Sequence, residues 1–205
     1  MTGVFLSGYG SRRAMAGGCY YSAVTSTYLC SSAENAATDV TQVLTGAPLV
    51  ITTIDGFGID TRSSGGDALT LSGTGGLTFT DAYVSQIYAD DTGINATNDG
   101  SGSLSVTSTG FVSAKREDAI FASNGADGED LTIEAYELYA DDYAVNARNY
   151  GSGALSITTT GTVEGNHAIY ALNYGSDLTV NTIDVTGYDG AIEAINKGSG
   201  LLSIE

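Results

Sequence analysis

Two adjacent pairs of carboxylates recur in this sequence in matching surroundings. Asp90 and Asp91 follow Tyr-Ala in YADDTGINATNDGSG, and Asp141 and Asp142 follow Tyr-Ala in YADDYAVNARNYGSG. Paired carboxylates can serve as the acid and base of a glycosidase or as oxygen ligands of Ca²⁺. Aspartate is equally common in tight turns, where its side chain bonds to its own backbone. We predict a solvated turn at both pairs, with a weak site for Ca²⁺ or another cation as the alternative.

Other groups that could do chemistry are few. The sequence has one histidine, His167, and only five Lys and Arg residues beyond position 33. No cluster of acids and bases recurs on one face, as a polysaccharide lyase would require, and two cysteines without clustered histidines cannot form a zinc site. The formal net charge of −17 repels phosphate backbones, which excludes nucleic acid as a partner. We predict no catalytic residue and no cofactor.

A repeated motif, apolar-x-Ala-x-Asn, dominates the second half of the chain. Its leading residues are Ile94, Ile120, Val145, Ile169 and Ile192, so the steps between copies are 26, 25, 24 and 23 residues. A Gly-rich turn and a Leu-[Ser/Thr]-[Val/Ile] motif follow each copy, and a third apolar patch closes most units. Each unit therefore carries three short strand signals, which is typical of a solenoid.

The motif also predicts what lies inside the solenoid. A strand places residues i, i+2 and i+4 on one face, so the apolar residue, the Ala and the Asn point inward together. A buried Asn amide needs hydrogen-bond partners, and stacked coils supply them as a ladder along the axis. The expected fold is an all-β parallel β-helix with about three strands per coil of 23–27 residues. The predicted ladder consists of Asn98, Asn124, Asn149, Asn173 and Asn196.

Threonines and tyrosines suggest surface features of this solenoid. Thr-x-Thr occurs at 107–109 and 158–160, but the coil between them carries Glu134-Ala135-Tyr136, which breaks a rank of the kind that ice binding requires. Tyr150 and Tyr174 follow equivalent asparagines on successive coils. We expect neighbouring tyrosine rings to stack on each other, with outward binding of carbohydrate or protein as the alternative.

The chain divides into three parts. Residues 1–33 contain no acid and run from Arg12-Arg13 through a mildly apolar stretch to small residues, which is the layout of a secretory signal peptide. The alternative is an irregular N-terminal cap, in which Cys19 and Cys30 could form a disulfide. Residues 34–90 are expected to form a cap and less regular coils, because the step from Ile59 to Ile94 is 35 residues. Residues 91–205 form the regular repeats, and we expect further repeats beyond them.

The pattern A-I-x-A-x-N-x-G-S-G-x-L-S-I, with TTTGTVEG after one copy, resembles the passenger repeats of Gram-negative autotransporter proteins over roughly residues 38–205. The resemblance implies a right-handed β-helix that is secreted or exposed at the cell surface and is attached to the outer membrane through a C-terminal translocator barrel. It also implies an adhesin-like role toward host-cell, matrix or carbohydrate ligands. We therefore expect a structural or adhesive segment without catalysis. The alternative is a fragment of a carbohydrate-active β-helix enzyme, either a polysaccharide lyase or a hydrolase.

Overall fold

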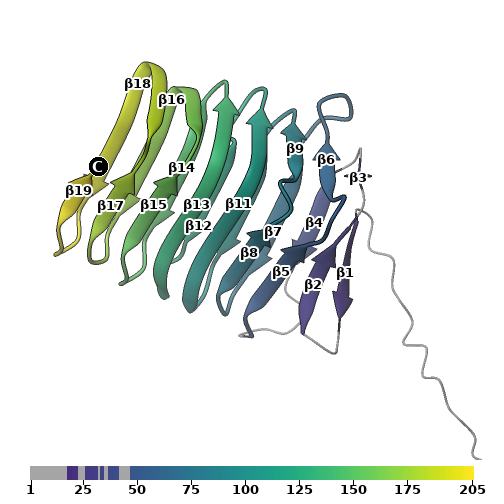
Figure 1. Ribbon diagram of the computed structural model, residues 1–205. Coiled ribbons are helices and arrows are strands. Elements are labelled where there is room, and N and C mark those ends of the chain that lie inside the picture. The colour runs from purple at the N-terminus through teal and green to yellow at the C-terminus, as the bar shows by residue number, and fades with distance from the viewer. Residues whose placement is uncertain (1–17, 23–25, 32, 35–36, 42–46) are drawn as a thin grey trace, which may run out of the picture.

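The computed structural model describes residues 18–22, 26–31, 33–34, 37–41 and 47–205. Every regular element in these ranges is a β-strand, and the strands wind into a solenoid of about seven turns (Figure 1). The described ranges contain no helix that could cross a membrane. The predicted all-β solenoid is therefore confirmed.

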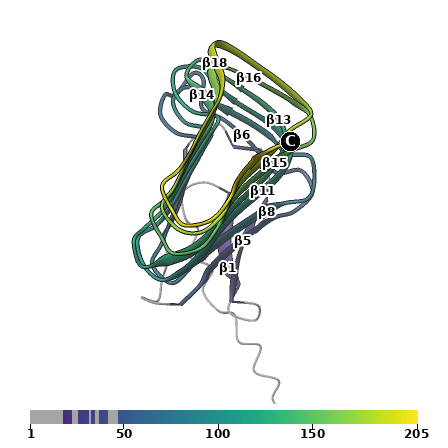
Figure 2. The same ribbon diagram turned by 90° about the vertical axis from the view of Figure 1, so that its left-hand side faces the viewer.

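Each turn of the solenoid has three sides, and successive turns superimpose when viewed along the stacking axis (Figure 2). The first side is built from β2 (Thr27–Cys30), β5 (Leu49–Thr53), β8 (Leu77–Asp81), the first half of β11 (Gly102–Ala114), the first half of β13 (Gly128–Ala140), β15 (Leu155–Thr159), β17 (Leu178–Asn181) and β19 (Leu202–Ile204). The second side is built from β3 (Ala33–Glu34), β6 (Gly58–Asp60), β9 (Gln86–Ala89), the second halves of β11 and β13, and the first halves of β16 (Thr162–Asn173) and β18 (Asp184–Asn196). The third side is built from β4 (Thr38–Thr41), β7 (Leu69–Gly73), β10 (Ile94–Asn98), β12 (Ile120–Asn124), β14 (Tyr143–Asn149) and the second halves of β16 and β18.

The strands of neighbouring turns pair in parallel, so equivalent residues form columns along the axis. On the third side, Ile120 lies between Ile94 and Val145, as the repeat spacing predicts. Burial alternates along β10 and β12, with the apolar residue, Ala and Asn buried and the residues between them half-buried. Each fully buried Ile, Leu or Val contributes roughly 1.5–3 kcal/mol relative to exposure. One coil cannot bury these residues alone, so the core exists only because the coils are stacked.

The first coils are more regular than the 35-residue step suggests. Ile59 is not the equivalent of Ile94, because Ile59 lies on the second side and pairs with Ile87. Leu69 is the residue that pairs with Ile94, which gives a step of 25 residues (94 − 69). The apolar-x-Ala-x-Asn motif cannot be recognised in β7, because β7 carries Leu71 and Gly73 where β10 has Ala96 and Asn98. The stretch from β5 to β9 is thus in phase with the later repeats.

The N-terminal end of the stack departs from the parallel order. β1 (Cys19–Ser22) pairs with β2 as an antiparallel hairpin, and β2 in turn lies parallel to β5. The buried Cys19 and Cys30 form a disulfide across this hairpin. β1 therefore covers the edge of β2 that faces away from β5. Arg12 and Arg13, on which the signal-peptide prediction depends, lie outside the described residues, and that prediction stays open.

Candidate functional site

A ladder of buried asparagine side chains runs along the axis beside the corner between the third and first sides. The Nδ2 of each ladder residue donates to the Oδ1 of the next, over 2.8 Å from Asn98 to Asn124, 3.2 Å from Asn124 to Asn149, 3.1 Å from Asn149 to Asn173 and 3.2 Å from Asn173 to Asn196. Each Nδ2 also donates to carbonyl oxygens of the Gly-rich turn that follows it, as Asn149 does to Gly153 over 3.2 Å. The ladder ties each turn to its neighbour from β10 to β18.

The first carboxylate pair lies against cations of the next coil. The Arg116 guanidinium contacts the Asp90 carboxylate and lies 2.9 Å from Asp91 Oδ1, and Lys115 Nζ lies 3.7 Å from Asp90 Oδ1. The chain itself therefore supplies the positive charge that a bound cation would bring. Among the described residues, no three acidic, histidine or cysteine side chains gather as metal ligands. A weak cation site at these turns stays the alternative to a solvated turn, and a chelator can test it.

The second carboxylate pair has different neighbours. Asp141 is exposed, and Asp142 Oδ1 lies 4.0 Å from His167 Nδ1, a contact that becomes an ion pair only when the histidine is protonated. The His167 ring stacks on Tyr143 with ring centroids 5.1 Å apart. The four aspartates are not brought together, because the coil that carries Lys115 and Arg116 separates the pairs. The four carboxylates therefore do not form one cluster.

Asp118 is an acidic residue that our sequence reasoning missed. Its side chain is buried, and its carboxylate accepts hydrogen bonds from the Tyr143 amide over 3.3 Å and from Asn146 Nδ2 over 2.9 Å. Burial raises the pKa of Asp118 to about 6, and the negative charges of neighbouring acids act in the same direction. Asp67, which lies 51 residues earlier (118 − 67), makes the equivalent bond to Asn95. The 51-residue recurrence could have flagged the position, although not its burial.

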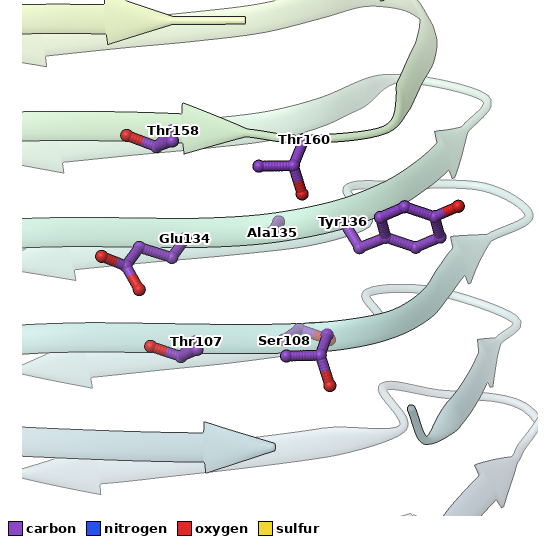
Figure 3. Close-up of a pocket in the computed structure, with 8 residues that line it drawn as sticks. Thr107, Ser108, Glu134, Ala135, Tyr136, Thr158 and Thr160 are labelled. Carbon is purple, nitrogen blue, oxygen red and sulfur yellow. The ribbon is translucent and has the colours of Figure 1, made fainter. Parts of the chain in front are cut away.

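A hollow of about 250 Å³ opens on the first side, near the bend toward the second side. It is lined by Thr107, Ser108, Thr109, Glu134, Ala135, Tyr136, Thr158 and Thr160. Figure 3 shows Glu134 and Tyr136 on the middle of three stacked strands, with threonines on the strands above and below. The register agrees, because Glu134 pairs with Thr107 on one side and with Thr158 on the other. The broken threonine rank in the sequence is therefore the place where the hollow lies.

The side chains of the hollow can bind but are poorly equipped for acid–base catalysis. Glu134 is the only carboxylate in the lining, and the lining contains no Lys, Arg or His. Tyr136 presents a ring that is 45% exposed. Ser108 Oγ is buried and has no hydrogen-bond partner within the part of the chain that the structure describes. The arrangement offers one hydrogen-bond acceptor with a charge, an aromatic face and several hydroxyls.

Two columns of small polar residues extend from this hollow along the outside of the first side. They follow from the parallel register of β8, β11, β13, β15, β17 and β19. The first column is Thr78, Ser105, Thr132, Ser156, Thr179 and Ser203, and the second is Thr80, Thr107, Glu134, Thr158 and Asn181. Glu134 is the only charged residue among these eleven, and Glu205 follows Asn181 on the last coil, where its N–H donates to the Val180 carbonyl oxygen. We call these two columns the hydroxyl face.

A second, smaller hollow lies on the second side. It is lined by Phe111, Glu137, Leu138, Tyr139, Thr162 and Glu164. Two of these residues are carboxylates and two are aromatic, which is a residue set that carbohydrate-active enzymes also use. Glu164 Oε1 already accepts a hydrogen bond from the exposed Tyr188 hydroxyl over 2.9 Å.

The predicted stacking of tyrosines is present at the corner that follows the asparagine ladder. The rings of Tyr150 and Tyr174 stack with centroids 5.6 Å apart, and Lys197 Nζ lies 3.0 Å from the Tyr174 hydroxyl.

Searches against protein-family models, curated proteins and solved structures found no match. Functional inference therefore depends on the geometry of the coils and their outer faces.

Proposed function

We propose that this chain is a structural and adhesive segment of an autotransporter-like passenger, secreted or exposed at the cell surface, with no catalysis of its own. The observation that carries the proposal is the continuity of the inside: one set of apolar columns and one asparagine ladder run through the repeats. Secretion and attachment through a translocator barrel, along with further repeats, are part of the proposal and rest on the repeat resemblance.

The continuous interior supports a role as a rigid support. Each coil contacts only its neighbours, and every contact is a row of parallel hydrogen bonds closed by a buried core. Pulling on a ligand held at one coil thus loads the whole stack rather than one flexible loop. The net charge of −17 keeps such an array soluble and separate from other acidic surfaces.

The outside supports an adhesive role. Apart from Glu134, the hydroxyl face consists of uncharged donors and acceptors whose neighbours on adjacent coils lie about 4.8 Å apart, as strand spacing dictates. Its central coil carries the hollow with Glu134 and Tyr136. Contacts that repeat along several coils can add up to strong attachment even when each is weak.

The alternative function is a carbohydrate-active enzyme, and the second hollow is the observation that favours it. Glu137 and Glu164 both line that hollow, and a glycosidase needs two carboxylates across the scissile bond. We favour adhesion because Glu164 is already engaged by Tyr188 and neither glutamate lies in an enclosed cleft that would exclude water.

Two assays separate these functions. Beads coated with the whole chain should adhere to host cells or to extracellular matrix more strongly than beads coated with an unrelated acidic protein of similar size. Incubation with a panel of neutral and acidic polysaccharides should release no products. Product release that disappears in Glu137→Gln would instead establish the enzyme, and failure to adhere to any surface would refute the adhesive role.

A further inference from the structure

We propose that the hollow around Glu134 and Tyr136 is a subsite for one uncharged pyranose ring of an extended glycan, and that the hydroxyl face contacts the neighbouring sugars. This inference rests on the proposed adhesive function and names its ligand class. It is motivated by the coil that carries Glu134 and Tyr136 where the coils on either side of it carry Thr-x-Thr.

The size and shape of the hollow suit one sugar ring. Its volume of about 250 Å³ lies just below the range of roughly 300–1,000 Å³ that pockets for drug-sized molecules occupy. A folded protein partner generally needs about 1,000 Å² of buried surface, which this hollow does not supply. The hydroxyl face continues on both sides of the hollow along the axis, so an extended chain of sugars can follow it.

Tyr136 provides the apolar contact that sugar recognition requires. Its ring is 45% exposed and lies at the edge of the hollow, between the threonines of the adjacent coils (Figure 3). A pyranose ring has one face of C–H groups, and such a face packs on an aromatic ring, which is a large and rigid apolar surface. The tyrosine loses little conformational freedom on binding, because it rotates about only two side-chain bonds.

Charge selects a neutral sugar over an acidic one. Glu134 brings a negative charge into the hollow, and the lining contains no cationic side chain to compensate it. A uronate, sulfate or phosphate group would therefore meet an uncompensated carboxylate as well as the field of a chain with a net charge of −17. A neutral sugar instead donates its hydroxyl protons to the Glu134 oxygens, and hydrogen bonds to a carboxylate are stronger than neutral ones.

The test is isothermal titration of the whole chain with cellohexaose, N-acetylchitohexaose and mannohexaose, and with an oligogalacturonate of the same length as the acidic probe. We expect at least one neutral hexaose to bind and the acidic probe not to bind. Tyr136→Ala should weaken binding of the neutral hexaose about tenfold, which corresponds to about 1.4 kcal/mol. Tyr136→Phe should stay within about threefold of the wild type, because it keeps the ring.

Matched variants keep this test independent of folding. Tyr174→Ala removes an equally exposed tyrosine, at 44% against 45%, from a different corner and should leave the affinity unchanged. Glu134→Gln should weaken the neutral hexaose and lessen the discrimination against the acidic probe. The proposal is wrong if no neutral hexaose binds at millimolar concentration, if Tyr136→Ala and Tyr174→Ala have the same effect, or if the acidic probe binds more tightly.

A negative titration and a negative bead assay refute different proposals. If beads adhere but no neutral hexaose binds, the adhesive function stands and the ligand class proposed for this hollow is wrong. If a neutral hexaose binds through Tyr136 but beads do not adhere, the subsite stands and the adhesive function is wrong.

Discussion

Substitution of Asn149 by alanine should destabilise the solenoid more than any exposed change on the same coil. Asn149 is fully buried in the middle of the ladder. Its Oδ1 accepts from Asn124 Nδ2 and from the Gly151 amide, both over 3.2 Å, and its Nδ2 donates to Asn173 Oδ1 over 3.1 Å and to turn carbonyls. Alanine removes all of these bonds. The buried Gly151 N–H then loses its bond to Asn149 Oδ1.

The magnitude follows from counting what is lost. A typical hydrogen bond contributes roughly 0.5–1.5 kcal/mol net, and a buried group left unpaired costs about 1–3 kcal/mol. Because the lost bonds share one side chain and are not additive, we expect Asn149→Ala to lower the free energy of unfolding by about 3–5 kcal/mol. The same substitution at Asn196 should cost only about 1 kcal/mol, because part of that side chain reaches solvent and water can replace its bonds.

Urea unfolding followed by far-ultraviolet circular dichroism gives both values. Asn196→Ala is the matched control, since it has the same residue type and the same position in the repeat and differs in burial. For Asn149→Ala, the urea concentration at the midpoint should fall, while the slope of the unfolding free energy against urea concentration should not change. Equal losses for the two variants, or a loss below about 1 kcal/mol for Asn149→Ala, would refute the view that the ladder holds the coils together.

Three further predictions concern other positions. The pKa of Asp118 is raised to about 6 from an ordinary 3.8, so the folded chain holds this proton more tightly than the unfolded chain. The free energy of unfolding should therefore fall by up to about 3 kcal/mol as the pH rises from the lower pKa to the higher one. Asp118→Asn should flatten that slope and raise stability at pH 7, and an unchanged slope in urea titrations would contradict the assignment. Gly110→Ala places a methyl group against the Ser85 carbonyl oxygen and should cost about 2–4 kcal/mol, whereas Gly190→Ala meets only an ordinary contact and should be tolerated. A chelator should leave the melting temperature unchanged, because Arg116 already pairs with the neighbouring carboxylates; a clear fall would show a bound cation.

The register of the later coils could be predicted because the same residue, Asn, occupies the equivalent position on each of them. Asn recurs at every turn from β10 to β18, and its buried amide needs the next Asn as a partner. The earlier coils lack this marker, since Gly73 stands where Asn98 stands one coil later. Counting from Ile59 therefore selected a residue on the wrong side of the solenoid.

The hollow could be only partly predicted. The break in the threonine rank at Glu134 and Tyr136 is visible in the sequence, but the cavity beside it depends on how β11 and β13 bend from the first side to the second. The burial of Ser108 follows from strand alternation alone, because Leu104, Val106 and Ser108 share the inward face of β11. Asp118, by contrast, is buried by the coils on either side of it and not by its own neighbours in sequence.

The most direct test of the proposed function is adhesion under flow after removal of one coil. Because Ile120 and Val145 are equivalent, deletion of residues 120–144 joins the chain in register and removes Glu134 and Tyr136 with a single turn. Deletion of residues 169–191 shortens the stack by another turn and leaves the hollow in place. We predict that beads carrying the first deletion detach from host cells or matrix at much lower shear than beads carrying the second or the intact chain. Equal retention of all three would contradict an adhesive function centred on this face.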